Sequence, residues 1–101
     1  MSTSATKASR PLAIDVDVSD VTLNVRLADG RTISVPLLWY PRLANGKATE
    51  RAHWELVGGG HGIHWPELDE DVSVEALLSG RRSSESPSSL KKWLAARQRG
   101  S

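Results

Sequence analysis

The stretch LAIDVDVSDVTLNVRLADGRTISVPL, residues 12–37, contains three runs in which apolar and polar residues alternate. A period of two is typical of strands that bury one face. The pattern therefore predicts three adjacent antiparallel strands, with Leu12 and Ile14 on the buried face of the first. In the first hairpin, the same alternation predicts a two-residue turn that pairs Val18 with Val21.

The register of the second and third strands follows from their apolar faces. Cross-strand neighbours share a face, so a two-residue turn would set each apolar residue opposite a polar one. A three-residue loop, residues 28–30, instead pairs Val25 with Ile33. We therefore predict a type I turn that ends with Gly30 in the left-handed conformation.

The rest of the chain suggests short elements. These are a helical turn at residues 37–44, a helix from Thr49 to Leu56, a strand at 61–65, an acidic segment at 67–71 and a helix from the N-cap Ser73 to Gly80. We expect an α+β fold: a small antiparallel sheet of three or four strands with two or three short helices on one face, plus a C-terminal tail helix. The predicted organisation is a disordered segment 1–11, a domain 12–80, a linker 81–89 and a basic amphipathic helix 90–101.

Composition limits the classes of function. The 101 residues suffice for one domain. The absence of cysteine excludes disulfides and thiolate metal sites. No apolar run approaches 18 residues, and no secretory h-region is visible, so we expect a cytoplasmic protein without a membrane span. The net charge of +1 divides into +2 for residues 1–12, −6 for 13–80 and +5 for 81–101.

No catalytic, metal or cofactor site is favoured. His61 and His64 stand three residues apart on an expected strand, so their rings point to opposite faces. The acidic segment lacks the alternating ligands of a calcium loop. The glycines at 58–60 precede a strand, whereas a phosphate loop precedes a helix.

Two clusters are typical of interaction surfaces. Aromatic residues and arginine are enriched at interfaces, and an amphipathic helix can dock in a groove. The residues expected to bind a protein partner are Trp39, Tyr40, Arg42, Leu90, Trp93, Leu94 and Arg97. The basic residues that could contact nucleic acid are Arg81, Arg82, Lys91, Lys92, Arg97 and Arg99.

The segments DGRTISVPLLWYPRL (29–43), WELVGGGHGIHWPELDED (54–71) and VSVEALLSG (72–80) give a more specific indication. Together they resemble the bacterial domain of unknown function 2442. The resemblance implies a small antiparallel sheet covered by short helices, and no enzymatic activity. Some members resemble the antitoxin halves of two-gene toxin–antitoxin modules, encoded beside a small basic protein. Others carry a helix-turn-helix domain and look like regulators.

These observations lead to one principal hypothesis and two alternatives. We expect a non-enzymatic protein-binding module, the antitoxin-like partner of a small basic protein, with a homodimer through a sheet edge also open. The first alternative is a DNA-binding transcriptional or phage-defence regulator that uses the basic tail. The second is a small enzyme or metal protein that uses His61, His64 and the acidic segment.

Overall fold

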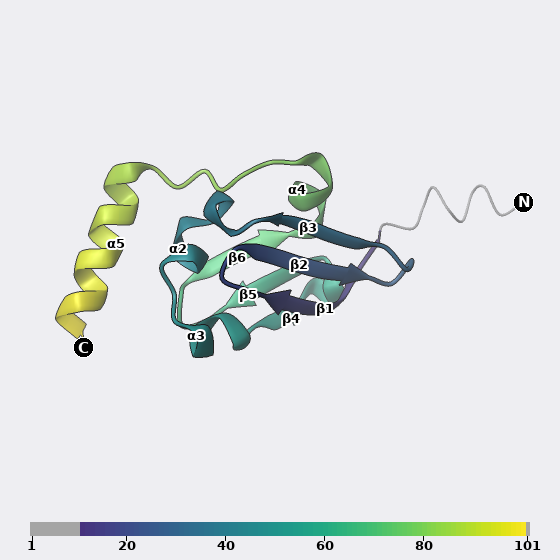
Figure 1. Cartoon of the computed structure of the whole chain (residues 1–101), viewed down its shortest axis with the longest axis horizontal. Helices are drawn as coiled ribbons and strands as arrows, with labels where there is room; N and C mark the ends of the chain where they lie inside the picture. Colours follow the sequence, from purple (N-terminus) through teal and green to yellow (C-terminus); the bar gives the residue numbers. More distant parts are fainter. Residues whose placement is uncertain (1–10, 101) are drawn as a thin grey trace, which may run out of the picture.

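The computed structural model describes residues 11–100, with side chains up to Gln98 (Figure 1). The expectation for the segment before Pro11 therefore lies outside the described residues. The first sheet is antiparallel in the order β1-β2-β3, and its strands are β1 (Ala13–Val18), β2 (Thr22–Leu27) and β3 (Thr32–Pro36). Val25 pairs with Ile33, and Gly30 has a φ of +96°. Both features confirm the predicted three-residue loop.

The first hairpin has a longer connection than predicted. Val18 pairs with Leu23 and not with Val21, and residues 19–21 join the two strands. The Ser19 hydroxyl accepts hydrogen bonds from the N–H groups of Val21 and Thr22 at 3.2 and 2.9 Å. This serine-centred turn needs more residues than a two-residue connection provides. The predicted Val18–Val21 pair is therefore wrong.

A β-bulge begins the first strand. Ala13 pairs with Leu27 and Asp15 with Arg26, which leaves Ile14 as the extra residue. The extra residue shifts the alternation of faces before it. Ala13 is accordingly buried, whereas Ile14 is 51% exposed. The expectation that Ile14 lies on the buried face is wrong.

Residues 55–73 form a second antiparallel sheet in the order β4-β5-β6. Its strands are β4 (Glu55–Val57), β5 (Gly62–Trp65) and β6 (Glu70–Ser73), and the 3-10 turn η2 (Gly58–Gly60) links the first two. The helix expected to reach Leu56 ends earlier, because α3 spans only Ala48–Ala52. Leu56 instead pairs with Ile63 in the sheet. Two helical turns are only marginally stable alone, so strand pairing prevails.

Short helical segments complete the chain. They are η1 (Leu37–Trp39), α2 (Pro41–Ala44), α4 (Val74–Ser79) and α5 (Pro87–Gly100). The Ser73 hydroxyl accepts a hydrogen bond from the Ala76 N–H at 3.0 Å, and Gly80 ends α4 with a φ of +73°. Both predicted ends of this helix are confirmed.

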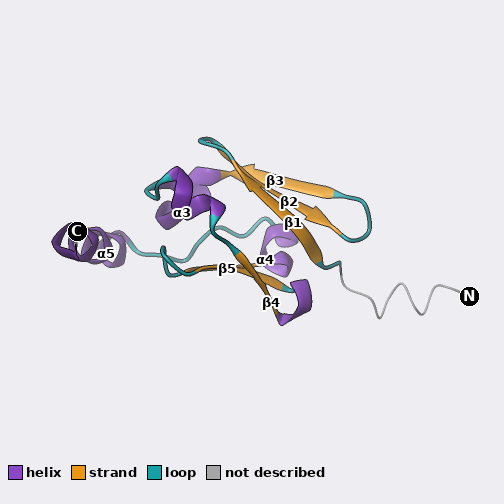
Figure 2. Ribbon diagram, turned by 90° about the horizontal axis from the view of Figure 1, so that it is seen from below, coloured by secondary structure: helices purple, strands orange, loops and turns teal. Residues whose placement is uncertain are grey.

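The two sheets face each other across one core (Figure 2). Leu23 and Val25 of the first sheet and Ile63 and Trp65 of the second are all fully buried. The indole N–H of Trp65 donates to the Arg51 carbonyl oxygen at 2.9 Å, which satisfies its buried donor. The predicted α+β class is confirmed, and the strands are divided between two three-stranded sheets.

Candidate interaction site at the C-terminal helix

Arg42 of α2 links the body of the protein, which consists of the two sheets and the short helices before residue 81, to the segment that leads into α5. Pro41 opens α2, and its fixed φ suits the first helical position beside Arg42. The Arg42 Nε and Nη2 donate to the two carboxylate oxygens of Glu85 at 2.6 and 2.9 Å. Its Nη1 donates to the carbonyl oxygen and Oδ2 of Asp69 at 3.0 and 3.3 Å. The Glu85 side chain is only 7% exposed, so this bidentate ion pair between Arg42 and Glu85, the paired fork, is largely shielded from water.

These hydrogen bonds change the proton affinity of both groups. Hydrogen bonding to Glu85 raises the pKa of Arg42. The same bond from Arg42 lowers the pKa of Glu85, and a hydrogen bond from Ser89 also lowers it. The charged forms of both side chains are therefore favoured in this arrangement.

Trp93 of α5 lies against two guanidinium groups. The Arg42 and Arg97 guanidinium carbons lie over its ring, 5.1 and 4.7 Å from the centroid. Arg97 also donates from Nη2 to Glu50 Oε1 at 2.8 Å, and this bond lowers the pKa of Glu50. Cation–π contacts and a partly buried ion pair thus attach α5 to the body.

The segment between α4 and α5 also contacts the body. The Ser83 N–H donates to the Trp39 carbonyl oxygen at 3.0 Å, and the Tyr40 hydroxyl donates to the Arg81 carbonyl oxygen at 3.1 Å. The Arg82 guanidinium lies over the Trp39 ring, 5.0 Å from its centroid. Burial raises the pKa of Tyr40, which keeps its hydroxyl protonated as a donor.

We call the resulting cluster the helix-docking site; its residues are Arg42, Glu50, Glu85, Trp93 and Arg97. The structure brings together three of the residues predicted to bind a partner, because Arg42 and Arg97 both lie over the ring of Trp93. Trp39 and Tyr40 contact the segment leading to α5. Leu90 and Leu94 lie on α5 and are half-buried.

The basic residues predicted to contact nucleic acid have different environments. Arg82 and Arg97 lie against indole rings, and Arg97 is half-buried. Exposed residues are Arg81, Arg82, Lys91 and Lys92. The side chain of Arg99 lies outside the described residues.

Sequence reasoning missed the acidic half of the site. Glu50, Asp69 and Glu85 hold the two arginines, but the sequence places them in three separate segments. The sequence offered one sign of this ion pairing: Glu85 is the single acidic residue in the basic segment 81–101.

Glu70 is the other group that the sequence did not single out. It lies on β6 opposite Trp65, on the same face as the buried Val72. Its Oε1 accepts a hydrogen bond from the Asp71 N–H at 3.2 Å, while its buried Oε2 has no hydrogen-bond partner. Burial raises the pKa of Glu70 to about 7. Beside it is a polar cavity of about 400 Å³, which Arg42 and Glu85 also line.

Two of the three histidines form pairs with carboxylates. His53 Nδ1 lies 2.8 Å from Glu67 Oε1, and His64 Nδ1 lies 2.7 Å from Asp71 Oδ1. Within residues 11–100, no group of three or more histidine or acidic side chains is arranged to hold a metal ion.

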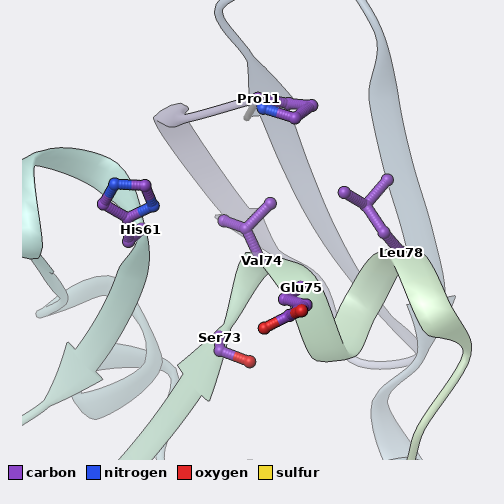
Figure 3. Close-up of a pocket in the computed structure, with 6 residues that line it drawn as sticks. All are labelled: Pro11, His61, Ser73, Val74, Glu75 and Leu78. Carbon is purple, nitrogen blue, oxygen red and sulfur yellow. The ribbon is translucent and has the colours of Figure 1, made fainter. Parts of the chain in front are cut away.

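His61 lines a separate, more apolar pocket of about 320 Å³ beside α4. Figure 3 shows Val74 and Leu78 of α4 pointing toward Pro11, with His61 beside them. Glu75 and Ser73 complete the wall. The Ser73 hydroxyl accepts the capping hydrogen bond from the Ala76 N–H.

Fold and site together define a small two-sheet α+β domain with a C-terminal helix docked by arginine contacts. The chain belongs to the family described as protein of unknown function (DUF2442), whose model matches residues 13–83. The match ends before α5, so this helix and three residues of the helix-docking site, Glu85, Trp93 and Arg97, lie beyond the family model.

Two solved structures are similar. A protein of unknown function from Rhodospirillum rubrum is 28% identical, with a TM-score of 0.66, and the match covers 76% of this chain and 95% of that one. An uncharacterised protein from Chromobacterium violaceum has the same TM-score at 21% identity, and the match covers 95% of this chain and 84% of that one. The second likeness shows the fold alone. No curated protein matches this chain.

No helix within the described part of the chain is both long enough and apolar enough to cross a membrane.

Proposed function

We propose that this protein is a non-enzymatic protein-binding module, the antitoxin-like partner of a small basic protein in a bacterial two-gene module. The observation that carries the proposal is the mode of α5 docking. Side chains of Arg42, Trp93 and Arg97 hold the helix on the body, with few buried apolar contacts. Such contacts can be exchanged for a partner's without unfolding the core.

The charge of the body supports a basic partner. Residues 13–80 carry a net charge of −6, and most of their carboxylates are exposed. Asp15 and Asp17 lie on the outer side of β1, while Glu55 and Asp71 lie on the outer side of the second sheet. Complementary charge accelerates association and favours a basic protein over an acidic one.

The composition of α5 supports its role in the complex. Leu90, Trp93 and Leu94 share its apolar side and remain only half-buried in the isolated chain. Aromatic side chains with residual exposure are common energetic centres of interfaces. In the proposed complex these three residues anchor the partner, and Arg42 and Trp39 extend the surface.

The test is quantitative co-purification of the tagged full-length chain from its native cell at low salt, followed by affinity measurement with the recovered partner. Trp93→Ala is compared with Val21→Ala, a control because Val21 is 71% exposed in the turn between β1 and β2 and is not part of the helix-docking site. We expect Trp93→Ala to weaken binding by at least about tenfold and Val21→Ala to leave it unchanged. Raising the salt concentration should weaken binding of the unmodified chain.

Equal affinity for both variants, or an acidic partner, contradicts the proposal. Recovery of nucleic acid alone would favour the DNA-binding alternative. The structure gives that alternative less support, because Arg82 and Arg97 are engaged with Trp39 and Trp93.

A further inference from the structure

The negative charge of the body is concentrated in the segment that contains the second sheet. Residues 13–51, which contain the first sheet, carry five acidic and five basic residues and are neutral as a whole. Residues 52–80 carry six acidic residues and no lysine or arginine. All six except Glu70 are exposed. The second sheet and its connections therefore present a surface of a single sign.

Polar side chains form a row across the outer face of this sheet. Glu55 of β4 pairs with His64 of β5, and His64 pairs with Asp71 of β6. Cross-strand partners share a face, and Ile63 and Trp65 on either side of His64 are fully buried, so the row points away from the core. Within residues 11–98, neither Glu55 nor Asp71 is paired with a lysine or arginine.

The opposite charge lies on the exposed side of α5. Residues 81–101 carry six basic residues and one acidic residue. Helical spacing places Lys91 and Lys92 away from the half-buried side of α5, which contains Trp93, and both lysines are exposed. Neither lysine forms an ion pair within the described residues. Their charges are therefore not used to hold α5 on its own body.

The acidic face and the lysine side of α5 do not neutralise each other within one chain. In Figures 1 and 2, α5 lies at one end of the molecule, away from β4. The ion pairs that attach α5 to the body join Arg42 to Glu85 and Arg97 to Glu50, and none involves the outer face of the second sheet. Two complementary surfaces are thus left open on every copy of the chain.

We propose that the outer face of the second sheet binds the lysine side of α5 from a second copy of this chain. Glu55 and Asp71 of one copy pair with Lys91 and Lys92 of the other, and the reciprocal contact closes a two-fold dimer. Exposed ion pairs are weak and are screened by salt, so this dimer forms at low ionic strength. Self-association of the free chain is independent of the proposed protein partner, so either can fail while the other stands.

The experiment is analytical ultracentrifugation of the full chain at several protein concentrations, in about 20 mM and about 500 mM salt, which differ strongly in screening. We expect the mass of a dimer at low salt and that of a single chain at high salt. Glu55→Gln/Asp71→Asn should lower the association constant by at least about tenfold. Asp15→Asn/Asp17→Asn is the matched control: it changes the net charge equally, but on the first sheet, and should leave association unchanged.

Charge reversal identifies the two contacting surfaces. Lys91→Glu/Lys92→Glu and Glu55→Lys/Asp71→Lys should each be monomeric alone, because like charges then meet, and an equimolar mixture should form a heterodimer. Urea unfolding of each variant confirms that it is folded. A single-chain mass for the unmodified protein at low salt would overturn the proposal. Equal effects of the two neutralised pairs, or a mixture that stays monomeric, would also overturn it.

Discussion

Gly60 lies against the first strand in a conformation that L side chains rarely adopt. Its φ is +107°, and a Cβ atom there would lie 2.7 Å from the Ala13 carbonyl oxygen. The neighbouring Gly59 also has a positive φ, of +69°, but a Cβ atom added there would have no neighbouring atom within 4 Å. The two glycines therefore separate the cost of backbone conformation from the cost of close packing.

We expect Gly60→Ala to destabilise the protein by about 3 kcal/mol, since backbone strain and the clash with β1 add. Gly59→Ala should cost about 1 kcal/mol, from backbone conformation alone. Urea unfolding followed by tryptophan fluorescence gives both values. Equal losses for the two variants would mean that contact with Ala13 does not constrain the turn.

The position of α5 depends on a few side-chain contacts with the body. Its 14 residues are only marginally helical in isolation. The helix gains its position from the paired fork between Arg42 and Glu85 and from the contact of Arg97 with Glu50. Loss of one partner in the fork would leave the other charge partly buried and unpaired.

Replacing Glu85 with glutamine should therefore loosen α5 and leave the two sheets intact. At pH 6 we expect amide exchange in residues 90–98 to accelerate by about fivefold, with unchanged exchange in β2 and β5. Native-state hydrogen exchange measures both regions in one sample. Acceleration confined to the sheets, or none at all, would show that Glu85 does not hold the helix.

For the molecule as a whole, pH acts on stability in two opposite directions. The pKa of Glu70 is raised in the folded state, so its contribution is fully present below pH 4.5 and is lost as pH rises through about 7. The pKa values of Glu50 and Glu85 are lowered, so their contributions are present above pH 4.5 and are lost on acidification.

We accordingly expect maximal stability near pH 4.5, where the contributions of Glu50 and Glu85 are present and that of Glu70 is not yet lost. The free energy of unfolding should fall by about 1–2 kcal/mol as pH rises from 4.5 through 7, a value reduced for the partial exposure of Glu70. Glu70→Gln should abolish this decline. Urea unfolding at a series of pH values tests the prediction, and an unchanged decline in the variant contradicts it.

Several features could be predicted from the sequence because their causes are local. Alternation sets the pairing of Val25 with Ile33, and the three-residue loop follows from that pairing. Ser73 and Gly80 bound α4 because capping depends on residues within one turn. Trp93, Arg42 and Arg97 were identified as interaction residues from composition and spacing alone, although whether they bind a partner stays a prediction.

Other features depend on residues far apart in the chain. Leu56 lies in a strand and not in a helix because Ile63 offers it a pairing partner. Glu70 appears in the sequence as one of several solvated acids, yet pairing with Trp65 turns it toward the core. Arg42 meets Glu85 across 43 residues, a contact that no local pattern encodes. Periodicity and capping act over a few residues, whereas burial and ion pairing arise only when distant segments pack together.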